Sequence, residues 1–190
     1  MLRILSLTTA TAIGLTAPAY ADWNADPTHS AIMFEVDHFG FSTVIGRFTD
    51  FEITFDFDEA APEETAVSAV IDTASVDSGY GPRDEHLRTG DFFDVENHPT
   101  MTFESESLEI TGDETAQLHG VLTLLGESND VSLDVVLNGI GANPFGGPDI
   151  AGFSASGMID RTNFGMDFGA PAIGQDVLIR IEFEATRAEE

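Results

Sequence analysis

Cysteine and lysine are both absent from this chain of 190 residues. Without cysteine the fold must be held by burial and strand pairing alone, and thiol catalysis and cysteine-based metal sites are excluded. Without lysine, all seven basic residues are arginine, against 34 aspartate and glutamate residues. The resulting net charge of −27 repels nucleic acid and anionic lipid headgroups, so neither is expected as a partner. The same carboxylate shell keeps proteins of saline habitats hydrated.

Long apolar runs are also missing, except at the N-terminus. Residues 1–3 form a short positive segment, residues 4–18 are apolar or small, and residues 19–21 (Ala-Tyr-Ala) fit a signal-peptide cleavage site. We therefore expect a signal peptide over residues 1–21, cleaved after Ala21, and a single domain over residues 22–190. No later segment is apolar enough to span a bilayer, so the mature chain is expected to be soluble and periplasmic or secreted.

Helical periodicity is absent after residue 21, apart from a short helical or loop segment near residues 83–94. Apolar and polar residues alternate instead, which is typical of strands with one buried face. The alternating segments are residues 30–38, 51–57, 67–71, 101–110, 117–125, 131–137, 150–159 and 177–185. About eight strands with short connections predict an all-β antiparallel fold, closed as a barrel or stacked as a sandwich. The inward faces are apolar, so the interior should be oily.

Four motifs, in this order and spacing, give the chain a family resemblance. They are DPTHSAIMFEVDHFGFSTVIGRFTDF, RDEHLRTGDFFDVENHPTMTF, GVLTLLGES and IDRTNFGM. Together they resemble the YceI family of exported, lipocalin-like proteins over essentially the whole mature chain. The resemblance implies an antiparallel barrel with an elongated apolar cavity that holds a polyisoprenoid or a similar long amphiphile. One turn departs from the family pattern, because residues 126–129 (Gly-Glu-Ser-Asn) lack the lysine of a Gly-Val-Thr-Lys-like turn, which weakens the expectation of a diphosphate headgroup.

The resemblance and the alternation together predict which side chains face the ligand. The tail would lie along the inward apolar rows, and the headgroup would meet polar side chains at a mouth. The expected cavity residues are Ile32, Phe34, Val36, Phe51, Ile53, Phe55, Ile71, Phe92, Phe93, Met101, Phe103, Leu122, Leu124, Phe153, Ile179 and Phe183. The expected mouth residues are His38, Arg83, Asp84, His86, His98 and Arg161.

Several of these mouth residues also have a purely structural interpretation. His38 ends an alternating strand and can contact a headgroup or be a core histidine bonded to backbone carbonyls. Arg83 and Arg88 can bind phosphate or carboxylate, but nearby acids favour internal ion pairs. Arg161 can face the mouth or anchor the next turn, and His29 is interpreted as structural.

The segment 82–103 also carries the main alternative to a lipid-binding function. Its histidines, His86 and His98, lie among carboxylates and could serve a metal-dependent enzyme or a secreted hydrolase, although the spacing fits no zinc motif. Phe92 and Phe93 indicate a lid instead, because at least one of them should be buried in the barrel.

The function expected from these observations is that of an exported, non-enzymatic carrier of a quinone, polyprenol or polyprenyl phosphate, with a role in stress response. It would need no covalent cofactor and no metal. A third hypothesis is a structural or stress-protective protein whose interior is solid side chain. The ligand, its donor and acceptor, and the oligomeric state stay open.

Overall fold

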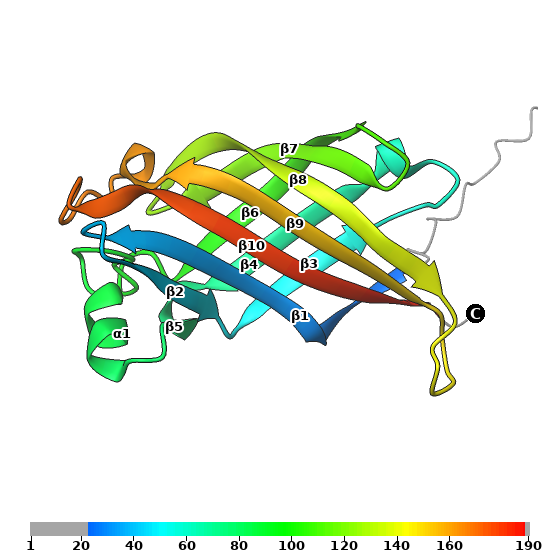
Figure 1. Cartoon of the computed structure of the whole chain (residues 1–190), viewed down its shortest axis with the longest axis horizontal. Coiled ribbons are helices and arrows are strands. Elements are labelled where there is room, and N and C mark those ends of the chain that lie inside the picture. The colour runs from blue at the N-terminus through cyan, green and yellow to red at the C-terminus, as the bar shows by residue number, and fades with distance from the viewer. Residues whose placement is uncertain (1–22, 189–190) are drawn as a thin grey trace, which may run out of the picture.

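The computed structural model describes residues 23–188, so the expected signal peptide lies outside the described residues. Within them, ten strands form one antiparallel sheet (Figure 1). The strands are β1 (Trp23–His38), β2 (Ser42–Phe48), β3 (Phe51–Asp56), β4 (Ala66–Asp72), β5 (Val76–Asp77), β6 (Thr100–Ile110), β7 (Thr115–Leu124), β8 (Glu127–Gly141), β9 (Ile150–Asp160) and β10 (Ile173–Arg187). The helical elements are α1 (Gly81–Leu87) and the 3-10 turns η1 (Pro62–Glu64), η2 (Thr73–Ser75) and η3 (Arg161–Phe164). No helix within residues 23–188 has the length and apolar character needed to cross a membrane.

The sheet curls back on itself to form a barrel. Its strand order is β3-β4-β6-β7-β8-β9-β10-β1-β2-β5, and β1 also contacts β3, the strand at the other end of this order. The strands run obliquely along the long axis in Figure 1, and the 15 residues of β10 span about 50 Å of extended chain. Helix α1 lies at one end of the barrel, which we call the α1 end. The predicted all-β antiparallel barrel is confirmed.

Alternation predicts eight of the ten strands and misses β2 and β5. The inward face of β2 carries Gly46 between Val44 and Phe48, which interrupts the apolar pattern. Glycine is required there because a Cβ atom would lie 2.2 Å from Cζ of the Phe34 ring on the neighbouring strand. Strand β5 has only two residues, too few for any periodicity. The short helical segment expected near residues 83–94 is α1 with the turns that follow it.

Close approach of strands makes a second glycine indispensable. A Cβ on Gly157 of β9 would lie 2.5 Å from the carbonyl oxygen of Ser132 on β8. We expect Gly157→Ala to lower the free energy of unfolding by about 1–3 kcal/mol, because that carbonyl belongs to the sheet backbone and cannot move aside. Gly152→Ala on the same strand is the matched control, since its Cβ would lie 3.8 Å from Cβ of Asn138. Urea denaturation measures both variants, and equal midpoints for the two would contradict the packing described here.

Candidate ligand-binding cavity

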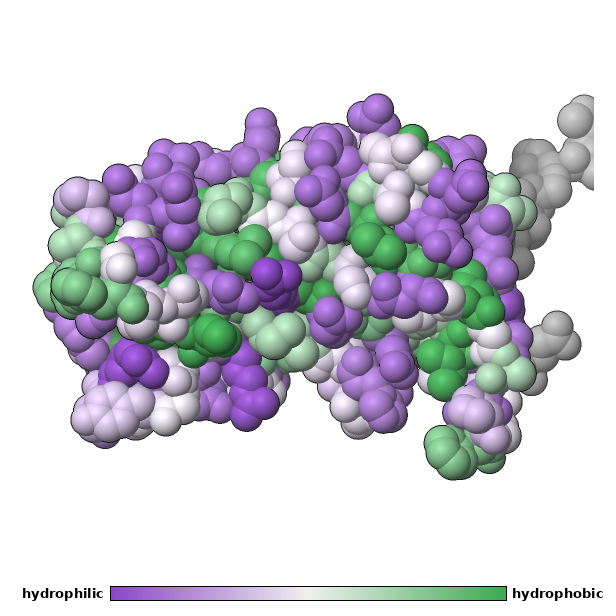
Figure 2. All heavy atoms as spheres, viewed as in Figure 1, coloured by the Kyte–Doolittle hydropathy of each residue, from purple (hydrophilic) through white to green (hydrophobic). Residues whose placement is uncertain are grey.

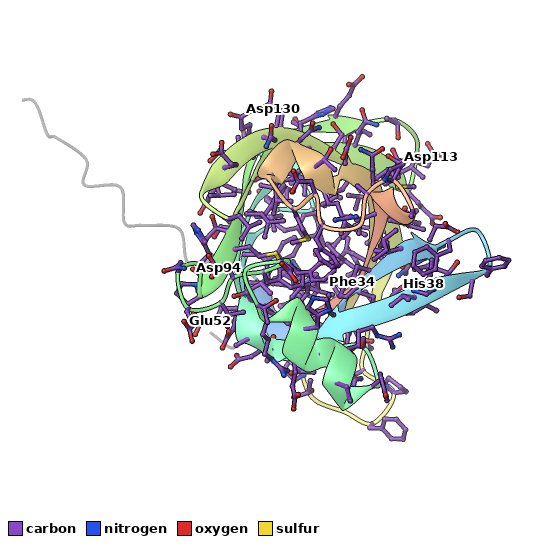
Figure 3. All side chains as sticks on the ribbon, turned by 90° about the vertical axis from the view of Figure 1, so that its left-hand side faces the viewer. Phe34, His38, Glu52, Asp94, Asp113 and Asp130 are labelled. Atoms are coloured by element: carbon purple, nitrogen blue, oxygen red, sulfur yellow. The ribbon has the colours of Figure 1, made fainter. Side chains whose placement is uncertain are left out.

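The barrel encloses an elongated cavity of about 720 Å³ whose lining comes from strands on every side and from both ends. Figure 3 looks along the barrel from the α1 end and shows Phe34 pointing into the interior. Fifteen of the sixteen predicted apolar residues line this cavity: Ile32, Phe34, Val36, Ile53, Phe55, Ile71, Phe92, Phe93, Met101, Phe103, Leu122, Leu124, Phe153, Ile179 and Phe183. The interior is therefore hollow, which contradicts the hypothesis of solid side chain.

Aromatic rings shape both halves of the cavity. Away from α1, the ring centroid of Phe55 lies 5.3 Å from that of Phe153 and 5.0 Å from that of Phe183, in edge-to-face contacts. Near α1, Phe48 packs edge-on against Phe93 at 5.5 Å. Phe92 and Phe93 are both buried and both line the cavity, whereas the sequence predicted this for at least one of them. Such rings give a rigid wall with few polar atoms.

Phe51 is the exception among the predicted apolar residues. It lines a separate hollow of about 310 Å³, together with Ala25 and Pro27 of β1. The register between β1 and β10 shifts between Asp26 and Ala31, so β1 bulges where β3 passes it. Alternation alone places Phe51 with Ile53 and Phe55 in the main cavity, and that assignment is corrected by the bulge.

Basic side chains reach the cavity at its α1 end. His38, Arg83 and His86 all line it there, in agreement with the predicted mouth. Arg83 donates from Nε and Nη2 to the hydroxyl and carbonyl oxygens of Ser78, each at 2.7 Å. Its guanidinium carbon lies 6.0 Å from the ring centroid of Tyr80. These contacts fix the direction of Arg83, and its Nη1 has no partner within residues 23–188.

Three rings pack together at this end of the cavity. The ring centroids of His86, Phe92 and Phe168 lie 5.0–5.3 Å from one another. Nε2 of His86 also lies 2.8 Å from a carboxylate oxygen of Asp91. The three rings connect α1, the turn after it and the segment before β10. The segment 82–103, whose histidines and carboxylates suggested a possible catalytic site, therefore forms part of the cavity wall.

Asp84 and His98 do not line the cavity, contrary to the predicted mouth. Asp84 is buried and accepts hydrogen bonds from the backbone amide and hydroxyl of Ser78, so it holds α1 against the preceding segment. The carbonyl oxygen of His98 accepts a hydrogen bond from the Thr73 hydroxyl at 2.8 Å, which positions the start of β6. Both residues therefore stabilise elements of the cavity wall without lining the cavity.

The predicted ion pairs of Arg83, in α1, and Arg88, at its C-terminal end, are also corrected. Arg88 donates to the carbonyl oxygens of Ala74 (2.7 Å) and Val76 (2.9 Å), as Arg83 does to Ser78. Within residues 23–188 neither arginine forms a salt bridge. The backbone carbonyls of η2, of β5 and of the residue after β5 need partners, and the arginines satisfy them.

Arg161 anchors a loop. Only 3 % of its surface is exposed. The guanidinium donates to four backbone carbonyls, those of Met166 (2.6 Å), Gly174 (2.8 Å), Phe168 (3.0 Å) and Ile173 (3.0 Å). Burial lowers the pKa of Arg161, while the nearby carboxylate of Asp160 opposes this effect. Arg161 lines the cavity, as predicted, but its donors are engaged by the loop, which favours the anchoring role.

The opposite end of the cavity is acidic. Glu59, Asp113 and Glu114 line it there, and sequence reasoning missed all three. They lie in the turns after β3 and between β6 and β7. The turn composition was visible in the sequence, but carboxylates are so frequent in this chain that none of them stood out. The α1 end therefore carries His38, Arg83 and His86 with one carboxylate, Asp37. The other end carries Asp113 and Glu114, while Glu59 is paired with Arg187 at 2.5 Å.

One exposed group of possible metal ligands lies outside the barrel, among residues 23–188. It consists of Asp26, His29 and Glu184, whose ligand atoms lie within 4.8 Å of one another. A hydrogen bond from His29 lowers the pKa of Asp26 to about 2 and raises that of His29. Asp26 also binds Thr28, so this group stabilises the β1 bulge and supports a structural role for His29. His86 and His98 are not in this group.

The anchoring role of Arg161 can be measured. We expect Arg161→Met to lower the free energy of unfolding by at least about 3 kcal/mol, because several buried carbonyls lose their donor. Arg180→Met removes an exposed pair with Glu35 (2.7 Å) and should lower it by at most about 1 kcal/mol. Thermal or urea unfolding compares them, and a stable Arg161→Met protein would show that the loop needs no anchor.

Fold and cavity define the class of protein: an antiparallel β-barrel built around an elongated apolar binding cavity. Residues 23–185 match the model of the YceI-like domain, and the chain belongs to the YceI family. A UPF0312 protein of Pseudomonas aeruginosa (strain LESB58) is 40% identical over 166 residues, which cover 85% of this chain and 86% of the relative.

Solved structures share the fold. The YCEI protein of Campylobacter jejuni is 32% identical, with a TM-score of 0.73 over 80% of this chain and 90% of the other. A polyisoprenoid binding domain from Saccharophagus degradans has a TM-score of 0.63, over 89% of this chain and 100% of that domain. At 15% identity the second likeness shows the fold alone.

Proposed function

We propose that this protein binds and carries a long isoprenoid amphiphile, such as a quinone, polyprenol or polyprenyl phosphate, and is not an enzyme. The observation that best supports this proposal is the cavity of about 720 Å³ with its nearly continuous apolar wall. Transfer of apolar surface from water into such a wall gains about 25 cal/mol per Å², so a prenyl tail needs few polar contacts to bind. The fold shared with a polyisoprenoid binding domain supports the same ligand class.

The two ends of the cavity favour one orientation of the ligand. At the α1 end, His38, Arg83 and His86 offer hydrogen-bond donors to a quinone carbonyl, a hydroxyl or a phosphate. At the other end, Asp113 and Glu114 would repel an anionic headgroup. The proposed ligand therefore places its headgroup near α1 and its tail toward the cluster of Phe55, Phe153 and Phe183.

A tail-length test uses two variants of strand β9. Ala155 lines the cavity, so Ala155→Phe should shorten the space for a tail and lower affinity for a long-tailed quinone at least about tenfold. Affinity for a short-tailed quinone should fall less. Ser154→Phe is the matched control, because Ser154 points outward and bonds Glu182 on β10 at 2.7 Å.

Trp23 provides the readout for this test. It is the single tryptophan of the chain, and its ring lies 6.4 Å from that of Phe57, which lines the cavity. Because Trp23 lies at the tail end, a long-tailed quinone with a bromine atom at the end of its tail is expected to quench its fluorescence. Displacement of this probe by unlabelled quinones of either tail length, titrated in detergent micelles, yields their dissociation constants. Absence of quenching by the probe, or equal affinities for the two variants, would contradict the carrier function.

Export is part of the same proposal and has its own test. The chain produced in a Gram-negative host with residues 1–21 present should be recovered from the periplasm beginning at Asp22. Intact-mass measurement of the purified protein reads this N-terminus directly. A periplasm without the protein, or a cytoplasmic protein that retains residues 1–21, would contradict export.

A further inference from the structure

Several segments of this acidic chain contain no acidic residue, and two of them lie at the α1 end of the barrel. Residues 38–49 separate Asp37 from Asp50, and residues 168–175 separate Asp167 from Asp176. Residues 115–126, 135–148 and 150–159 are also free of acid, so what distinguishes the first two segments is their position beside the cavity. The first segment contains the β1–β2 turn and β2, and the second forms the start of β10 with the loop before it.

The two segments lie together at the α1 end. His38 pairs with Ile173 in the β1–β10 ladder, and the backbone amide of Phe39 donates to the carbonyl oxygen of Ala172 at 3.0 Å. Figure 3 shows the β1–β2 hairpin extending outward from this end of the barrel, with His38 near its base. We call the surface formed by residues 38–49 and 168–175 the acid-free tip.

Large apolar side chains of the acid-free tip face solvent. Phe41 is 91% exposed and Ile45 is 60% exposed, and Phe39 and Phe168 are also exposed. Figure 2 shows apolar atoms at the corresponding end of the molecule. Phe39 has a φ of 61° and Gly40 a φ of 73°, and the amide of Gly40 donates to the Asp37 carboxylate at 2.8 Å. The turn is thus held in a defined shape while its rings stay in water.

The acid-free tip is continuous with the end of the cavity. His38, Val44, Phe168 and Ile173 belong to it and also line the cavity. Phe39 and Phe41 are not part of the lining and lie in the turn between β1 and β2. A partner that contacts these two rings would therefore be brought to the α1 end of the cavity.

Shape and charge favour a lipid bilayer over a second copy of the chain as that partner. A stable protein interface buries roughly 1,600 Å² in complementary surfaces, and two protruding hairpins offer each other little such area. The interfacial region of a bilayer accepts aromatic side chains without a matching shape. The acidic remainder of the surface is repelled by anionic lipids, so the fitting surface is a bilayer of neutral or zwitterionic headgroups.

We propose that the acid-free tip docks this protein on a neutral or zwitterionic bilayer, with Phe39 and Phe41 inserted, so that an isoprenoid chain passes between bilayer and cavity at the α1 end. The role of this docking in ligand transfer rests on the proposed carrier function. Binding to the bilayer can be measured whether or not the protein carries a ligand. The acidic body then faces away from the membrane and limits the contact to the tip.

The docking is measured with phosphatidylcholine vesicles in a flotation assay of the chain lacking residues 1–21. Replacement of both rings (Phe39→Ser with Phe41→Ser) should lower the partition coefficient at least about tenfold, because two exposed apolar side chains are lost from the contact. Phe145→Ser is the comparison variant, because Phe145 is 98% exposed in the acid-free loop between β8 and β9, away from α1, and docking through the acid-free tip predicts unchanged binding for it. Anionic lipid added to the vesicles should weaken binding of the unsubstituted chain.

Three outcomes would overturn the docking: no binding of the unsubstituted chain, equal binding by the double variant, or loss of binding only in Phe145→Ser. A dimer in solution that dissociates in the double variant would assign the tip to a second copy instead. Urea unfolding checks that the double variant is folded, and Phe41→Ser alone provides a milder test.

A transfer assay separates docking from ligand binding. The tail-brominated quinone delivered in detergent micelles should quench Trp23 equally in the unsubstituted chain and the double variant, because neither ring lines the cavity. The same quinone delivered in phosphatidylcholine vesicles should quench it at least about tenfold more slowly in the double variant. Failure of micellar quenching in every chain would contradict the carrier function, whereas equal rates from vesicles would contradict the docking.

Discussion

The antiparallel hydrogen-bond ladder that runs from β3 round to β2 is the constraint on which the rest of the structure depends. It pairs backbone donors and acceptors within the wall, so the interior needs no polar side chains to satisfy them. Inward positions can therefore be apolar, and the rings of Phe55, Phe153 and Phe183 can line a space that is not filled. Where strands approach closely, a glycine such as Gly157 keeps the ladder intact.

The ends of the barrel, where the ladder stops, determine the chemistry. Backbone carbonyls left unpaired there are met by arginines, as Arg88 shows at the carbonyls of Ala74 and Val76. Arg161 does the same for the loop before β10. In a chain with so few cations, most of those near the α1 end hold the structure, and Arg83 combines such a role with a position in the cavity wall.

Alternation predicted most strands, and nearly all of the apolar residues assigned to the cavity do line it, because a side chain in a regular strand has only two directions to point. The prediction from alternation failed where the strands are irregular. Phe51 lies opposite the β1 bulge, and β2 has a glycine where an apolar residue would continue the pattern. The partners of the arginines were not predictable, because sequence shows nearby carboxylates but not carbonyls brought together by the fold. The acids at the far end were hidden by the abundance of carboxylates.

The central claim is that the hollow interior holds a long prenyl chain. Native mass spectrometry of the protein, purified gently from the cells that produce it, tests this most directly. The account predicts an added mass that solvent extraction removes and that fragmentation identifies as an isoprenoid lipid. A protein that is recovered without lipid, takes up no polyprenol or quinone and carries a stoichiometric metal ion instead would contradict it.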